Sequence, residues 1–128
     1  MREFVVIAKD RVGLLHDITK ALADENINID SIAADTVGGK AFIRIVCSNE
    51  RKAEEVLRKK KYKVVTSEVI VVKLKNRPGE LSEMTKKLAK ARINIENVHL
   101  LHKGAEEGIF ALKVDKHDKA LKVLKDYF

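Results

Sequence analysis

Two short turns in the chain carry groups that suit a small zwitterion. The first runs from Asp10 to Gly13 and the second from Asn76 to Gly79, and a segment with helical spacing follows each turn. The first N–H groups of a helix lack partners and carry partial positive charge, so they attract a carboxylate. Glycine lets a ligand approach the backbone closely. Asp10 and Asn76 can accept a hydrogen bond from an ammonium group, and together these features indicate an amino-acid site.

The same residues also have a purely structural interpretation. An Asp or Asn ahead of a helix is usually an N-cap that satisfies backbone groups without any ligand. Pro78 suits the first turn of a helix because its fixed φ is already helical. Spacing alone therefore favours capping over a ligand site.

The two turns belong to an internal repeat with an offset of 66 residues. Ten of the twenty positions in window 10–29 are identical to their partners in window 76–95. The repeat indicates two copies of one module, which we place at residues 1–67 and 68–128. A module of about 60 residues buries only roughly 60% of its unfolded surface, so we expect the copies to pack on each other and the chain to form a homodimer. In the first copy the identical residues are Arg11, Gly13, Leu15, Thr19, Lys20, Leu22, Ala23, Ile27, Asn28 and Ile29.

Apolar periodicity predicts the elements that hold these turns in the first copy. The expected order is strand 4–8, helix 14–25, a half-buried strand from residue 27, return strand 41–46, a second helix and strand 62–66. Gly38-Gly39 signals a tight hairpin, and Ser48 or Asn49 can cap the second helix. This order predicts an α+β fold with an antiparallel sheet and both helices on one face.

The second copy repeats the order but stops earlier. We expect strands 69–74, 93–101 and 109–114, and helix 81–91 with Leu81, Met84 and Leu88 facing inward. A last helix capped by Asp115 or Asp118 ends the chain, so the fourth strand is missing. The edge strand left bare could accept a partner strand.

Composition argues against several classes of protein. Cys47 is the only cysteine, so neither an intrachain disulfide nor a CxxC motif can form. The first residues enter a strand pattern directly, and no apolar run approaches the roughly 20 residues of a membrane span, so we expect a cytoplasmic protein. The net charge is +7, and its densest run, residues 58–61, fits a solvated helix end better than an anionic-partner patch.

Histidines and aromatic residues offer little further chemistry. His99 and His102 are three apart on an expected strand and should face opposite sides, so no shared metal is expected. No nucleophile-elbow or phosphate-loop motif is present, which predicts a non-enzyme without cofactor or metal. Phe42 and Phe110 are single aromatics on their strands, whereas RNA-binding sheets stack bases on several, so nucleic acid is an unexpected partner.

The repeated pattern Asp/Asn-Arg-x-Gly-x-Leu, followed by Thr, Leu-Ala and Ile-Asn-Ile, resembles the ACT domain, a regulatory module that binds amino acids. The first copy is similar to ACT segments of stringent-response synthetases and uridylyltransferases. The second is similar to the serine-binding ACT domain of phosphoglycerate dehydrogenase, whose contacts match Asn76 and Asn94, while a third contact matches Leu74. Leu74 has no polar side chain, which leaves an apolar amino acid open as the ligand.

The resemblance implies two ferredoxin-like βαββαβ modules with antiparallel sheets packed side by side. The second module departs from the family pattern, because its sequence lacks the last strand. It also implies a ligand at the interface of paired modules, held by the turn after the first strand and by the start of the second. The expected ligand-binding residues are Asp10, Arg11, Val12, Gly13, Leu14, Leu15, Asn28, Ile29, Asn76, Arg77, Pro78, Gly79, Glu80, Leu81, Asn94 and Ile95.

Two functions follow from this reading. The leading hypothesis is a non-catalytic regulatory protein that binds a small molecule, most simply an amino acid, and responds through ligand-dependent module packing. The alternative is a non-binding regulatory or assembly subunit that docks on a metabolic enzyme through a sheet edge or a helix face.

Overall fold

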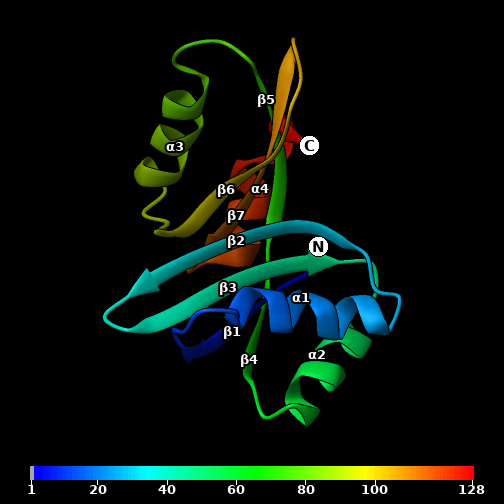
Figure 1. Cartoon of the computed structure of the whole chain (residues 1–128). Helices are drawn as coiled ribbons and strands as arrows, with labels where there is room; N and C mark the ends of the chain where they lie inside the picture. Colours follow the sequence, from blue (N-terminus) through cyan, green and yellow to red (C-terminus); the bar gives the residue numbers. More distant parts are fainter. Residues whose placement is uncertain (1) are drawn as a thin grey trace. The chain divides into compact units, whose positions relative to one another are not determined.

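The computed structural model describes residues 2–128, and these residues form two compact units, Arg2–Ser67 and Glu68–Phe128 (Figure 1). Each unit has an antiparallel sheet with helices on one face, so the predicted α+β class is confirmed. The units are described one at a time below.

The first unit follows the predicted order of strand, helix, strand, strand, helix, strand. Its sheet has the order β2-β3-β1-β4, and alternate strand residues point toward the helices because side chains alternate along a strand. Phe4 opposes Ile45 and Val6 opposes Ile43, and all four side chains are buried beneath the helices. The elements are β1 (Arg2–Lys9), α1 (Leu14–Asp24), β2 (Ile29–Val37), β3 (Lys40–Cys47), α2 (Glu50–Lys59) and β4 (Lys63–Glu68).

Local turn chemistry explains two features of this unit. Gly38 and Gly39 both have positive φ, 57° and 80°, as a two-residue type I′ hairpin between twisted strands requires. Asn49 is the N-cap of α2, and its side-chain oxygen accepts a hydrogen bond from the backbone N–H of Lys52 at 3.2 Å. Both predictions are confirmed.

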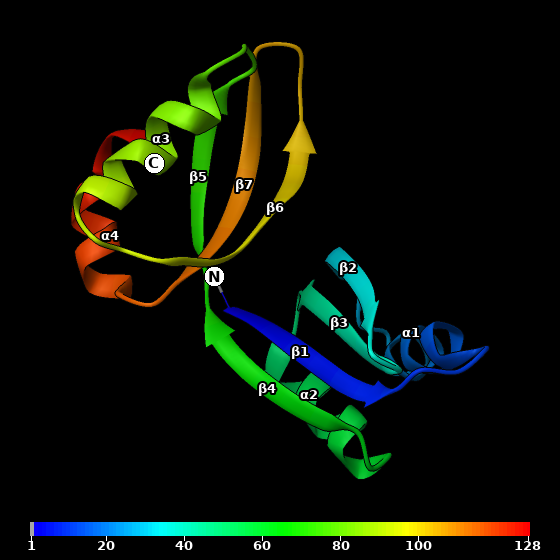
Figure 2. The same ribbon diagram turned by 90° about the vertical axis from the view of Figure 1, so that its left-hand side faces the viewer.

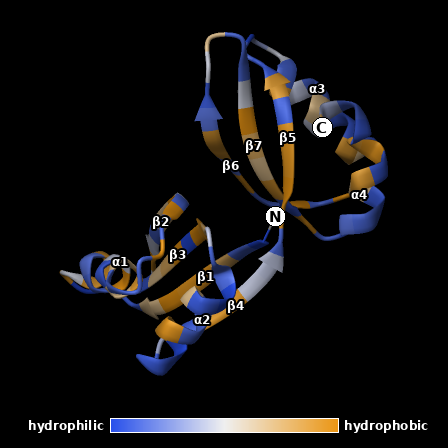
Figure 3. Cartoon of the chain, turned by 90° about the vertical axis from the view of Figure 1, so that its right-hand side faces the viewer, coloured by the Kyte–Doolittle hydropathy of each residue, from blue (hydrophilic) through white to orange (hydrophobic). Residues whose placement is uncertain are grey.

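The second unit has three strands in the order β5-β7-β6, with α3 and α4 on one side of the sheet (Figure 2). Apolar residues gather on its strands and on the inner side of α4 (Figure 3), where Met84, Leu88, Leu112 and Leu124 are fully buried. No strand of residues 68–128 pairs with the outer edge of β5. The elements are β5 (Ile70–Lys75), α3 (Glu80–Lys90), β6 (Ile95–Lys103), β7 (Glu107–Val114), α4 (His117–Val123) and the 3-10 helix η1 (Lys125–Tyr127).

Two sequence predictions for this unit are wrong. Leu81 is not part of the buried core but is 41% exposed, because it lines the cavity at the start of α3. Neither Asp115 nor Asp118 caps α4, whose N-cap is Lys116 without a side-chain cap bond. Instead, the Asp115 carboxylate accepts a hydrogen bond from the backbone N–H of Asn94 at 2.9 Å.

The prediction that His99 and His102 face opposite sides is also wrong. A bulge after Leu100 shifts the pairing, so that His99 opposes Ala111 while His102 opposes Ile109. Ala111 and Ile109 are two apart on β7 and therefore share a face, which puts both histidines on the side of the sheet away from the helices. Among residues 2–128 no cluster of three or more His, Cys, Asp or Glu side chains could hold a metal ion. No described helix is both long enough and apolar enough to cross a membrane.

Candidate functional site

Each repeated glycine occupies the N-cap of the first helix of its unit. Gly13 precedes α1 with φ 88°, Gly79 precedes α3 with φ 90°, and neither helix start has a side-chain cap bond. Residues with a Cβ rarely adopt this left-handed conformation, so backbone geometry itself requires glycine. Because Asp10 and Asn76 are not N-caps, the capping interpretation is wrong. The first N–H of each helix donates to the arginine carbonyl of its turn, Leu14 to Arg11 at 3.3 Å and Glu80 to Arg77 at 3.4 Å. The next N–H groups, beginning with those of Leu15 and Leu81, have no hydrogen-bond partner among the described residues.

Asp10 and Asn76 tie each turn to the tip of the neighbouring hairpin. The backbone N–H of Asp10 donates to the Gly39 carbonyl at 2.9 Å, and that of Asn76 donates to the Glu106 carbonyl at 2.8 Å. The Asn76 side chain also donates to the Gly104 carbonyl at 3.0 Å. The Asp10 carboxylate makes no hydrogen bond or ion pair within residues 2–128, so it remains available to a ligand.

The arginines of the two turns fold back onto their helices. Arg11 Nη2 lies 2.7 Å from the Asp17 carboxylate, and this hydrogen bond raises the pKa of the guanidinium. Arg77 makes the corresponding bond to Glu80. The apolar residues between arginine and glycine, Val12 and Pro78, are exposed at the tip of each turn.

A cavity lies beside each turn, between the helix start and the hairpin, and we call it the turn cavity. The turn cavity of the first unit has a volume of about 410 Å³ and that of the second about 170 Å³. Ligand sites commonly occupy ~300–1,000 Å³, so only the first falls in that range. The first cavity is lined by Asp10, Arg11, Gly13, Leu14, Leu15, His16, Ala34, Asp35, Thr36, Ala41 and Ile43. The second is lined by Leu74, Lys75, Asn76, Arg77, Glu80, Leu81, Leu100, Lys103, Gly108 and Phe110.

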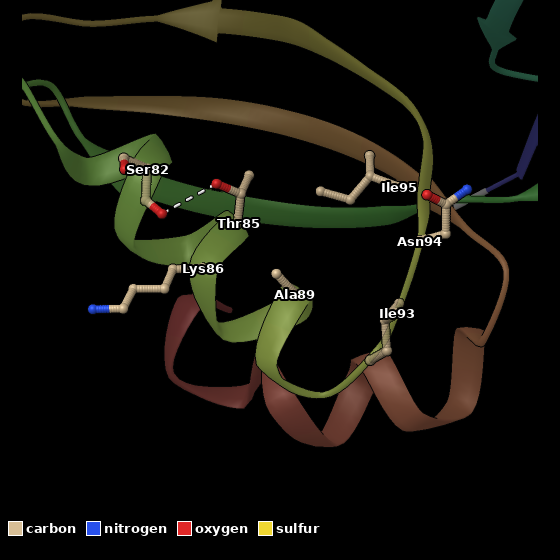
Figure 4. Close-up of a pocket in the computed structure, with 7 residues that line it drawn as sticks. All are labelled: Ser82, Thr85, Lys86, Ala89, Ile93, Asn94 and Ile95. Carbon is tan, nitrogen blue, oxygen red and sulfur yellow. Dashed lines mark hydrogen bonds between the residues drawn. The ribbon is translucent and has the colours of Figure 1, made fainter.

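A second hollow runs along the flank of the same helix, from its first turn to the start of the next strand, and we call it the groove. Figure 4 shows the groove of the second unit, which has a volume of about 470 Å³. It is lined by side chains of α3 and by the segment that leads from α3 into β6. Its residues are Ser82, Thr85, Lys86, Ala89, Ile93, Asn94 and Ile95. The groove of the first unit (about 500 Å³) is lined by His16, Thr19, Lys20, Ala23, Ile27, Asn28 and Ile29.

The two grooves match residue for residue at the offset of 66, and only His16 and Ser82 differ in type. Several of these identical positions are exposed, so core packing does not explain why they agree. The sequence prediction included the Asn-Ile pairs of the grooves but missed Thr19, Lys20 and Ala23 together with their partners. The signal was available, because these residues were among the ten identities of the repeat.

The expected site residues of one unit divide between these two hollows. Asp10 lines the turn cavity and Asn28 lines the groove, and no cavity contains both. The 11-residue helix α1 separates them and is about 16 Å long at 1.5 Å per residue. An amino acid is too short to contact Asp10 and Asn28 of one unit at once.

The side-chain amides of Asn28 and Asn94, one in each groove, differ in their hydrogen bonding. The Asn28 amide donates to the Asp30 carboxylate at 3.3 Å. Asn94 is held through its backbone, since its N–H donates to the Asp115 side chain and its carbonyl accepts the Asp115 N–H at 3.1 Å. The Asn94 side-chain amide makes no hydrogen bond within the described residues and can serve a ligand.

The helix-facing side of each outer strand is left uncovered beside these hollows. Ile32 on β2 is 42% exposed, while Val98 and Leu100 on β6 are 42% and 47% exposed. Each of them opposes a helix-facing residue of the central strand, so each lies on the core side of its sheet but beyond the helices. Apolar surface of this kind marks a place where another protein surface can pack.

Comparison with known proteins agrees with this geometry. A family model described as the ACT domain pair matches residues 1–126, and the chain therefore belongs to the ACT-domain family, whose modules are regulatory. A solved structure of a Bacteroides thetaiotaomicron protein aligns with a TM-score of 0.89 at 22% identity, covering 98% of this chain and 86% of the other. The ligand-free regulatory subunit of aspartate kinase from Thermus thermophilus aligns with a TM-score of 0.72 at 16% identity, covering 99% and 92%. No curated protein matches the chain.

Proposed function

We propose that the chain is a non-catalytic regulatory protein that binds a free amino acid and changes the packing of its modules in response. The observation that carries this proposal is the pair of glycine N-caps. In each copy the helix start has no side-chain cap, and the residue whose N–H follows the bonded first one, Leu15 or Leu81, lines a cavity, which suits carboxylate binding.

The first turn also offers a partner for the other end of a zwitterion. The unengaged Asp10 carboxylate lines the same cavity as Gly13, so an ammonium group and a carboxylate can be met together. Charge-assisted hydrogen bonds to both ends would give selectivity for α-amino acids over simple carboxylic acids.

Binding that uses both the aspartate of the turn and the asparagine of the groove needs two modules. Since Asp10 and Asn28 of one unit lie at opposite ends of α1, an amino acid can contact residues of both kinds only where two modules meet. The uncovered apolar side chains of β2 and β6 provide a surface for such pairing. We therefore propose a homodimer in which ligand binding favours the packing that closes the site.

A thermal-shift screen of the twenty amino acids tests this proposal. We expect one chemically related group of amino acids to raise the melting temperature in proportion to the logarithm of concentration, as mass action requires. A flat response to the whole panel at millimolar concentrations would refute amino-acid binding.

An asparagine pair gives a matched control for the groove. Asn94→Ala removes a free amide from the groove and should reduce the shift without lowering the melting temperature of the free protein. Asn97→Ala changes the same residue type on the same strand but on the face away from the helices, and should keep the full shift. Equal shifts in both variants would place the ligand away from the groove.

A docking subunit without a ligand is the second candidate, and it is favoured by the outer edge of β5, which pairs with no strand among residues 2–128. The backbone groups of Ile70–Lys75 along that edge can accept a strand from another protein. The regulatory subunits of aspartate kinase among the structural neighbours are partners of an enzyme. Co-purification of an enzyme together with silence across the amino-acid panel would favour this candidate.

A further inference from the structure

The two turn cavities differ in the side chains that fill them, although they occupy equivalent places. Strand register establishes the equivalence: Ala8 opposes Ala41 in the first unit, as Leu74 opposes Gly108 in the second. One layer further in, Ala34 opposes Ile43 as Leu100 opposes Phe110.

Larger side chains narrow the cavity of the second unit. A Cβ added at Gly108 would lie 3.2 Å from the Phe110 ring and 3.6 Å from the Leu100 side chain, so both side chains fold over this glycine. Ala41 and Ala34 leave the corresponding space open in the first unit. This explains why the volume falls from about 410 Å³ to about 170 Å³.

We infer that each chain binds one amino acid at a turn, in the cavity of the first unit, and that this ligand has an aliphatic side chain. The inference rests on the proposed function and specifies its site and its ligand class. The second unit keeps the glycine turn but does not receive a ligand there.

The ligand class follows from the walls of the open cavity. Its floor is apolar, formed by Leu14, Ala41 and Ile43, whereas its charged groups sit at the mouth. Two of these charged groups are already engaged, since Arg11 pairs with Asp17 and Asp35 pairs with Arg44 at 3.0 Å. A charged ligand side chain would lose hydration against the floor without gaining a partner, while an aliphatic one gains by burial.

Calorimetric titration of the intact chain tests both parts. We expect one ligand per chain, and affinity rising about fourfold per methylene along alanine, 2-aminobutyrate and norvaline. Two ligands per chain, or tightest binding of an amino acid with a charged side chain, would overturn the inference.

Exchanging cavity residues between the units tests the location. By strand register, Ala34 corresponds to Leu100 and Thr36 to Lys103. Ala34→Leu and Thr36→Lys therefore introduce the side chains of the second cavity into the first, at exposed positions, and each should weaken binding at least tenfold. Lys103→Thr is the reciprocal control in the second unit and should change affinity less than twofold. Binding that survives both closing variants, or that Lys103→Thr weakens as much, overturns this inference alone. Failure of the unmodified chain to bind any amino acid overturns the proposed function as well.

Discussion

The left-handed glycine at the start of α3 gives the sharpest test of the turn geometry. Gly79 has φ 90°, and a Cβ built there would meet nothing within 4 Å, so substitution is resisted by backbone strain alone. A residue with a Cβ in this region costs about 1–2 kcal/mol relative to glycine. We therefore expect Gly79→Ala to lower the free energy of unfolding by about 1–2 kcal/mol.

Urea unfolding and calorimetry can measure this loss. A loss of 1 kcal/mol lowers the melting temperature by about 4–8 °C in a domain of 60–100 residues. Gly79→Asn is the matched control, because asparagine enters the left-handed region more readily and should lose less stability than alanine. Gly79→Val should lose the most, since a β-branched side chain is the least tolerant of this conformation.

The outcomes separate backbone strain from ligand contact. If Gly79→Ala is as stable as the unmodified chain, the left-handed turn is refuted. If asparagine is worse than alanine, strain is not what selects glycine. Since the inferred ligand lies at the turn of the first unit, a Gly79 variant that is still folded should bind an amino acid as tightly as the unmodified chain, and weaker binding would indicate ligand contact at the second turn.

Three further predictions address other features of the fold. Asn49→Ala should lower the free energy of unfolding by ~1 kcal/mol because it removes the cap bond to Lys52, whereas Lys116→Ala removes no cap bond from α4; equal losses in urea titrations would contradict this account. Burial raises the pKa of the Cys47 thiol, so at pH 8 the folded protein should react with a thiol reagent on the order of a hundredfold more slowly than in denaturant, and comparable rates would show an accessible thiol. Because the pKa of Cys47 is higher in the folded than in the unfolded chain, the thiol's contribution to the free energy of unfolding is fully present below its ordinary pKa and decreases as the pH rises above that value. Cys47→Ala should abolish this decrease in unfolding titrations at pH 7–10.

Patterns within a few residues predicted most of the secondary structure. The Gly38-Gly39 hairpin and the Asn49 cap were recognisable because each depends on backbone angles and hydrogen bonds confined to one turn. Helices α1 and α3 were recognisable from apolar spacing, to within one or two residues at their ends. Because the two copies are related by the repeat, the elements predicted in one copy could be compared with those predicted in the other.

Features that depend on strand pairing could not be predicted in the same way. The shared face of His99 and His102 results from a bulge, which inserts one residue and reverses the alternation of side chains along β6. Leu81 fitted an inward stripe by its spacing, but it lines the cavity at the start of α3, and such a cavity depends on side chains from other strands.

The sequence by itself determined that the chain contains two related modules and that a glycine turn precedes a helix in each. The repeat, the spacing of apolar residues and the turn residues can be read from the sequence, because each depends on residues that are close together along the chain or recur at a fixed offset. The tertiary structure decided that glycine is required by a left-handed N-cap, that Asp10 and Asn28 lie at opposite ends of a helix, and that one turn cavity has less than half the volume of the other. Cavity volume is set by side chains from different strands, such as Leu100 and Phe110, whose proximity exists only after the sheet has formed.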